Sequence, residues 1–132
     1  MEGQGVSSDC KEAIKWFRIS ADKGNVEAMG ILGVCYFEGQ GVSRNCDEAV
    51  KWYKIAAEKG NKEAMYNLAY CYANGVGITK DYIQSYAWSS VAIALQGNEE
   101  SVKLRNALTK KMTPSQIEQG QKLSREILSK QK

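Results

Sequence analysis

Histidine is absent from the 132 residues of the chain, which removes the commonest general base and the commonest metal ligand. The single proline, Pro114, argues against disordered linkers. No run of about 18 apolar residues exists, so the sequence predicts no membrane-spanning helix. The formal net charge of +3 is too small to indicate nucleic-acid binding, for which we would expect a concentrated basic face.

The N-terminus also lacks the features of a secretory signal, because neither a basic segment nor an apolar stretch follows Met1. A cytoplasmic location is therefore favoured from the residues given. The chain begins within a repeated unit and looks like the tail of a longer array. A missing upstream segment would leave a secreted or periplasmic location open.

The four cysteines show no metal-binding pattern, because no Cys-x-x-Cys occurs and no histidine can complete a zinc set. Cys10 and Cys46 are 36 residues apart, as are Cys35 and Cys71. The third unit has Tyr82 at the position that Cys10 and Cys46 occupy in the first two, which indicates a buried apolar position. The cysteines are therefore interpreted as buried free thiols. A Cys35–Cys46 disulfide across a turn is the alternative and would require an oxidising compartment. The sequence predicts no metal site and no cofactor.

One glycine motif occurs three times at a spacing of 36 residues. It reads Gly3-Gln4-Gly5-Val6, Gly39-Gln40-Gly41-Val42 and Gly75-Val76-Gly77-Ile78. Three tryptophans keep the same spacing, and residues 3–38 match residues 39–74 at 21 of 36 positions. A fixed period of about 20 to 50 residues is typical of a stacked repeat array. A phosphate-binding loop would need a preceding strand, so the glycines are interpreted as turns between repeats.

Each unit is predicted to be a pair of helices. A polar residue followed three places later by an acid or amide predicts helix starts near residues 9, 45 and 81, with residues 3–8 as a turn before the first of them. Asn25 and Asn61 are predicted to cap the other helix of each pair. Small alanines on one helix face large side chains such as Trp16 and Trp52 on the other, which predicts close helix packing.

The predicted fold class is therefore all-α, an α/α superhelix or solenoid of helix-hairpin repeats with about seven helices. One solenoid covers residues 1–132. Its predicted parts are a repeat at 3–38 that begins at its turn and second helix, a repeat at 39–74, a partial repeat at 75–97 and C-terminal capping helices at 98–130. In the cap, a polar helix runs from Glu99 to about Lys111, and Thr113 with Pro114 begins the last helix.

Two long motifs carry a resemblance to a known family. They are Ala28-x3-Leu32-Gly33-x2-Tyr36-x2-Gly39-x-Gly41-Val42 and Glu48-Ala49-x2-Trp52-Tyr53-x2-Ala56-Ala57-x2-Gly60-Asn61. Residues 3–100 resemble Sel1-like repeats, a branch of the tetratricopeptide superfamily. The next unit departs from the pattern at Ala69, where glycine is usual. The resemblance implies a right-handed superhelix and a role as an adaptor or scaffold in protein complexes.

Some bacterial members of this family are secreted or surface proteins that contact host factors. Certain secreted members carry a cysteine pair near the short turn of each unit, and residues 57–65 contain none. The predicted function is a non-enzymatic scaffold that binds a protein or peptide in a concave groove. A secreted or surface bacterial factor that engages a host protein is the alternative. A small hydrolase is the alternative of another class, but no catalytic constellation supports it.

The resemblance implies that the first helix of each pair lines the groove. Counting along these helices gives candidate protein-binding residues, which are Glu27, Val34, Phe37, Glu63, Tyr66, Asn67, Tyr70 and Asn74. The cap contributes Glu99 at the position equivalent to the other two acids. Exposed tyrosines beside acids and amides suit a peptide groove. The alternative is that these apolar side chains pack between neighbouring units.

The helix predicted at residues 9–23 has no preceding partner helix in this chain. Its apolar stripe consists of Ile14, Trp16, Phe17 and Ile19. Exposed apolar patches mark association, so this helix is predicted to form a homodimer contact. Basic residues on this helix and on the equivalent helix of the next unit have acids nearby. This pattern indicates a solvated face of mixed charge and no nucleic-acid partner.

Overall fold

Seven helices make up the structure, a computed structural model that describes residues 2–97 and 99–131. The helices are α1 (Glu2–Asp22), α2 (Val26–Glu38), α3 (Cys46–Glu58), α4 (Lys62–Asn74), α5 (Tyr82–Gln96), α6 (Glu99–Thr109) and α7 (Pro114–Lys130). The described ranges contain no strand, and the predicted all-α class is confirmed. None of the described helices combines the length and the apolar character needed to cross a bilayer.

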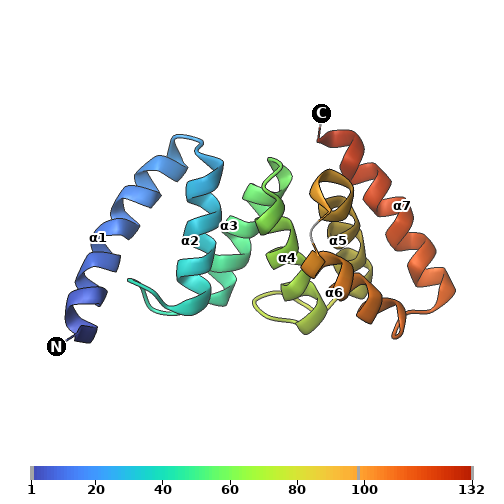
Figure 1. The fold of residues 1–132 in the computed structure, drawn as a ribbon, viewed down its shortest axis with the longest axis horizontal. Helices are drawn as coiled ribbons and strands as arrows, with labels where there is room; N and C mark the ends of the chain where they lie inside the picture. Colours follow the sequence, from blue (N-terminus) through green and yellow to red (C-terminus); the bar gives the residue numbers. More distant parts are fainter. Residues whose placement is uncertain (1, 98, 132) are drawn as a thin grey trace.

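The helices follow one another in a single row, with α1 at one end and α7 at the other (Figure 1). Each helix from α1 to α5 contacts the next, and α7 packs against α5. Contacts also join α2 to α4 and α4 to α6, so these three, here called the inner helices, form one layer. The remaining four are called the outer helices. This arrangement is the predicted solenoid of helix hairpins.

Short polar residues start the helices as the sequence predicts. The side-chain oxygens of Asn25 and Asn61 accept hydrogen bonds from the backbone N–H three residues on, at 2.9 and 2.8 Å. Asn45 and Asp81 do the same for α3 and α5, each at 3.1 Å. Thr113 completes a reciprocal box, because its backbone N–H also donates to the side chain three residues on. These bonds satisfy amide donors that a helix start leaves without partners.

The repeated glycines end one hairpin and begin the next. Gly39 and Gly75 adopt left-handed conformations with φ of +73° and +67°, and they terminate α2 and α4. Gly77 has φ of +71°, and a β-carbon there would overlap the backbone carbonyl of Cys46 at the start of α3. The turn after α4 therefore lies against the preceding hairpin, and the interpretation of these glycines as turns holds.

The prediction of a turn at residues 3–8 is wrong, because α1 is continuous from Glu2. Gly39 and Gly75 each follow a helix that they end, whereas no helix of this chain precedes Gly3. The glycines at positions 3 and 5 are therefore part of α1 and not of a turn. The start of the first helix near residue 9 is corrected accordingly.

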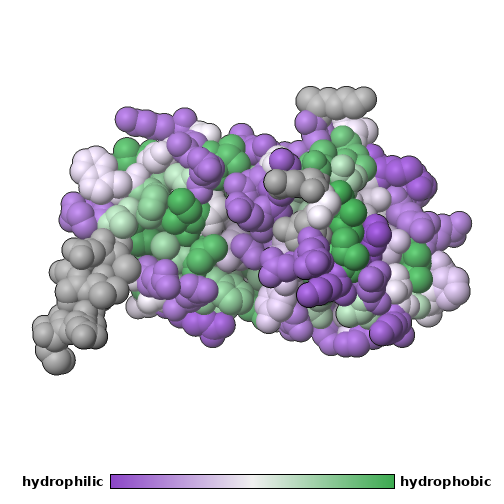
Figure 2. Space-filling model, viewed as in Figure 1, coloured by the Kyte–Doolittle hydropathy of each residue, from purple (hydrophilic) through white to green (hydrophobic). Residues whose placement is uncertain are grey.

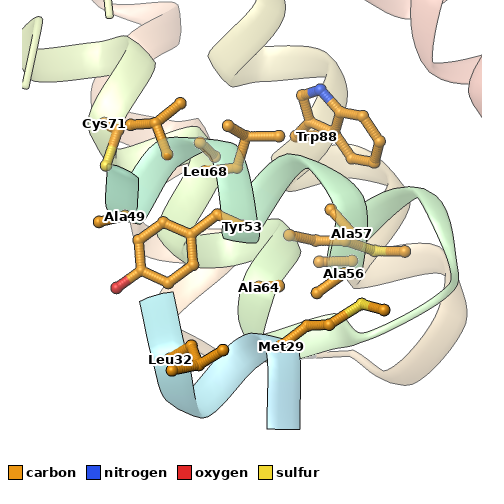
Figure 3. Packing of buried hydrophobic residues seen from close by; sticks show 14 of the residues in the cluster. Met29, Leu32, Ala49, Tyr53, Ala56, Ala57, Ala64, Leu68, Cys71 and Trp88 are labelled. Carbon is orange, nitrogen blue, oxygen red and sulfur yellow. The ribbon is translucent and has the colours of Figure 1, made fainter. Parts of the chain in front are cut away.

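The core runs along the interface between the two layers. Leu32, Met65 and Leu68 have no exposed surface or almost none. Figure 3 shows Ala56, Ala57 and other small side chains between larger ones from neighbouring helices, which lets the helix backbones approach closely. The predicted alternation of small and large residues is thus present from α2 onward.

The three repeated tryptophans have different environments. Trp88 of α5 is buried, Trp52 of α3 is half-buried and Trp16 of α1 is 63% exposed. The prediction that Trp16 packs against small side chains is therefore wrong. α3 and α5 each contact helices on both sides, whereas α1 contacts only α2 among the major contacts. The environment of each tryptophan follows from the number of neighbouring helices.

Candidate functional site

The inner helices line an open groove on one face of the solenoid. Its larger cavity has a volume of about 550 Å³. The lining residues come from α2, α4, α6 and adjacent turns, and they are Glu27, Gly30, Ile31, Val34, Cys35, Gln40, Asn61, Glu63, Ala64, Tyr66, Asn67 and Glu100. Five of the eight predicted binding residues lie here: Glu27, Val34, Glu63, Tyr66 and Asn67.

A second cavity of about 210 Å³ continues the groove. Its lining residues are Val34, Phe37, Glu38, Tyr53, Tyr66, Asn67 and Tyr70. Because Val34, Tyr66 and Asn67 line both cavities, the two spaces form one groove. Phe37 and Tyr70 join the other predicted residues here, so the structure brings seven of the eight together.

The eighth residue, Asn74, lines neither cavity. It is exposed, and its side-chain amide donates a hydrogen bond of 3.0 Å to the backbone carbonyl of Tyr70 on the same helix. Residues four apart on a helix lie one above the other, which explains this local contact. Asn74 therefore belongs to the end of α4 and is not part of the groove lining.

The aromatic residues of the groove divide into two kinds. Val34 and Phe37 are half-buried and pack against the core, so the alternative that they pack between units accounts for part of their surface. Tyr66 and Tyr70 are not among the described residues that pack on the buried clusters, and Tyr70 is 40% exposed. The rings of Phe37 and Tyr70 meet edge to face with centroids 6.4 Å apart.

Among the described residues, every charged side chain that lines the two cavities is a glutamate. Glu27, Glu63 and Glu100 line the larger cavity, and Glu38 lines the smaller. Burial, and then the nearby carboxylate of Glu100, raise the pKa of the Tyr66 hydroxyl. In the view of Figure 2, hydrophobic surface gathers over α1 and α2 and again over α5 and α6, whereas hydrophilic surface covers the middle of the row around α4.

The position in the cap predicted for Glu99 is occupied by Glu100. Helix α5 is longer than α3, and the first residue of the inner helix shifts by one position at α6. Glu100 is the second residue of α6, as Glu27 and Glu63 are of α2 and α4. Counting from the start of each helix, and not by the fixed period of 36, would have identified it.

Sequence reasoning also missed Ile31, whose side chain is 40% exposed in the groove. It follows Glu27 by four residues, and residues four apart share one face of a helix. At the far end of the groove, the Arg44 guanidinium donates to the backbone carbonyl of Phe37 at 2.8 Å and lies 5.6 Å from the centre of its ring. Arg44 is thus held against Phe37 and lines neither cavity.

The described residues include no group of three His, Cys, Asp or Glu side chains that could hold a metal ion. Cys46 carries a free thiol, so the alternative Cys35–Cys46 disulfide is not formed. Cys71 is wholly buried, and burial, with a further contribution from Cys46, raises the pKa of its thiol to about 12. Such a thiol is a poor nucleophile at neutral pH. The Cys10 side chain lies outside the described part of the chain.

A row of helix hairpins with a groove along its inner helices defines an α/α solenoid of the class that presents extended binding surfaces. The family model for the Sel1 repeat matches residues 1–25, 26–61 and 62–96. The chain belongs to the Sel1 repeat family, whose members typically serve as protein-interaction scaffolds. The second and third matched units begin at the inner helices α2 and α4, and the predicted division at residues 39 and 75 uses the same period of 36 residues in another frame.

Two solved structures resemble the chain over most of its length. One is a protective antigen present in uropathogenic Escherichia coli strains, with 35% identity and a TM-score of 0.89 over 91% of this chain and 26% of its own. The other is a Sel1 repeat protein from Oxalobacter formigenes, with 30% identity and a TM-score of 0.71 over 74% of this chain and 28% of its own. The chain thus spans about a quarter of each relative. Curated proteins give no match.

Proposed function

We propose that the chain is a non-enzymatic scaffold that binds a segment of a partner protein in the groove of the inner helices. The observation that carries this proposal is the placement of Tyr66 and Tyr70. Both contribute to the groove lining without packing on the buried clusters of the described residues. Tyrosine offers rigid apolar area together with a polar end, a combination enriched in binding surfaces.

The form of the groove supports a peptide segment more than a small metabolite. The larger cavity is open along one side and draws its lining from three successive inner helices. Small-molecule sites enclose most of their ligand, and they usually carry convergent polar or catalytic groups. Here the lining combines apolar side chains, glutamates and the amides Asn61 and Asn67, which can bond to a peptide backbone.

The proposal is tested by comparing capture of partner proteins by three forms of the chain. The groove variant is Tyr66→Ala/Tyr70→Ala, and the matched control is Ile55→Ala, which removes an exposed apolar side chain from outer helix α3. Far-UV circular dichroism establishes that both variants are folded. We expect the groove variant to lose captured partners that the control retains. Equal capture by the groove variant would show that the partner binds elsewhere.

A second candidate, a secreted or surface factor that engages a host protein, draws support from the 35% identity to a protective antigen. Antibodies against this chain would then label intact cells of the source organism. Labelling only after lysis would count against this candidate and leave the scaffold proposal standing. A hydrolase has no supporting residue cluster, and it would be revived by turnover that a single point substitution abolishes.

A further inference from the structure

The groove is acidic although the chain as a whole has a net charge of +3. Its larger cavity is lined by Glu27, Glu63 and Glu100, and none of the lysines and arginines that the structure describes lines either cavity. The three carboxylates stand beside apolar lining from Ile31 and Val34. The groove therefore offers negative charge and apolar surface together, which a partner must match.

Acidic residues near helix starts have a structural explanation, because they stabilise the positive end of the helix dipole. Asp47 and Glu48 illustrate this role, since they lie in the first turn of α3 and line neither cavity. The three groove glutamates differ from them in lining a cavity with apolar walls. It is the cavity, and not acidity alone, that distinguishes this site.

The groove glutamates also lack cationic partners within the described part of the chain. There, the one ion pair joins Lys51 to Glu48 at 3.8 Å, on an outer helix. Arg44 is held by the carbonyl and ring of Phe37, a residue that lines the smaller cavity. Removal of water by a bound segment would strengthen any charge pair that these carboxylates form.

We propose that the segment bound in this groove is basic, with lysine or arginine side chains reaching Glu27, Glu63 and Glu100. This inference rests on the proposed function and names the chemistry of its partner. Lysine and arginine lay their aliphatic stems on apolar surface while their charges stay at its edge, which matches the mixed lining of this groove. Anionic partners such as nucleic acid or acidic membranes are repelled by the same carboxylates.

The test uses a display library of random peptides of about twelve residues, enough to cross three helices in an extended conformation. Peptides are enriched on the wild-type chain, and their net charge is compared with that of the unselected library. Dissociation constants are then measured by fluorescence anisotropy. The groove variant replaces one acid on each inner helix: Glu27→Gln/Glu63→Gln/Glu100→Gln. The matched control replaces one exposed acid on each of three outer helices: Glu12→Gln/Glu58→Gln/Glu126→Gln.

We expect the enriched peptides to be positively charged. Three exposed charge pairs are lost in the groove variant, so its affinity should fall about tenfold or more, whereas the control should stay within about twofold. Affinity for the wild-type chain should also fall as salt rises, because ions screen exposed charge pairs. Acetylation of the lysines in one enriched peptide should weaken binding to the wild-type chain, and this measurement needs no variant to fold.

Three results would overturn the inference. Equal weakening by the groove variant and the control would show that the peptides respond to overall charge. Enriched peptides that are neutral or acidic, and that lose binding with Tyr66→Ala, would refute the basic segment and leave the proposed groove function intact. Peptides that bind Tyr66→Ala/Tyr70→Ala as tightly as the wild-type chain would refute the groove function itself.

Discussion

The ring of Tyr53 in α3 lies directly against the backbone of Gly33 in α2. A β-carbon on Gly33 would stand 2.5 Å from Cε1 of that ring. Tyr53 is almost fully buried, and it also lines the smaller cavity of the groove. The equivalent positions 36 residues later are Ala69 and Ser89. Ala69 has a methyl group that Gly33 lacks, and Ser89 lacks the ring of Tyr53. The chain thus carries the methyl group where the equivalent facing residue has no ring.

Substitution of Gly33 by alanine is predicted to destabilise the fold. The added methyl group would overpack the interface and lower the free energy of unfolding by about 1–3 kcal/mol. Gly30→Ala in the same helix is the control, because its nearest neighbour would be Asn61 at 3.6 Å, an ordinary contact. Removing glycine from a helix interior there should stabilise the fold by about 0.5–1 kcal/mol. Urea unfolding measures both, and a Gly33→Ala variant as stable as Gly30→Ala would contradict the close contact.

Gly77 is predicted to tolerate alanine less well than Gly97. Both have left-handed backbones, with φ of +71° and +73°, so alanine strains each by about 1–2 kcal/mol. A β-carbon at Gly97 would meet nothing within 4 Å, whereas at Gly77 it would overlap the carbonyl of Cys46. We expect overpacking to lower the unfolding free energy of Gly77→Ala by a further ~1–3 kcal/mol. Equal melting temperatures for the two variants would show that the turn does not press on α3.

Cys71 should resist alkylation while the chain is folded. At about pH 8, a thiol with a pKa of about 12 is ionised in roughly one molecule in ten thousand, and this one has no exposed surface. Cys46 is partly exposed and should react with iodoacetamide first. Peptide mapping by mass spectrometry distinguishes the two sites, and denaturant should equalise them. Early labelling of Cys71 would indicate that α4 opens readily.

Alkaline pH should weaken the fold. Burial raises the pKa values of Cys71, Tyr53 and Tyr72, so the folded state keeps these protons at a pH where the unfolded state releases them. The stabilisation is complete below the unfolded pKa of the thiol, 9.0, and is lost as pH rises towards about 12. Between about pH 7.5 and about pH 10.5, Cys71 alone should remove about 2 kcal/mol of unfolding free energy. Cys71→Ala should show a correspondingly smaller loss in urea unfolding.

Self-association through α1 remains a prediction, and the structure narrows it to two side chains. Ile14 is buried and Phe17 packs on the core, whereas Trp16 and Ile19 are 63% and 46% exposed on one face of the helix. We expect a reversible dimer at high micromolar concentration in sedimentation equilibrium. Trp16→Ser/Ile19→Ser should be monomeric, and Ile55→Ser on α3 should still dimerise. A wild-type chain that stays monomeric would contradict the prediction.

Features governed by neighbouring residues in sequence were predicted well. Asn25 and Asn61 cap helices because the bond they accept comes from three residues away, and the sequence contains both partners. Trp16 was placed wrongly because its burial depends on whether a further helix lies beside α1. Gly120 of α7 was missed for a similar reason: a β-carbon there would stand 2.7 Å from Cδ1 of Tyr86, a contact between distant segments.

The candidate site shows the same difference between features set by nearby residues and features set by distant segments. Helical spacing identified Tyr66 and Tyr70 because both lie on the face of α4 opposite its core residues. The same spacing could not show that Phe37 divides its surface between groove and core. Nor could the fixed period locate Glu100, since the extra length of α5 moves the start of α6 by one residue.

Glu27, Glu63 and Glu100 each stand second in an inner helix, so their separation follows the spacing of the helices. Axes of packed helices lie about 10 Å apart, and an extended peptide advances about 3.3 Å per residue. A segment laid across α2, α4 and α6 would meet a carboxylate at about every third residue. The spacing of the inner helices would then set the interval between basic residues in the bound segment, and each further repeat would add one more carboxylate to the series.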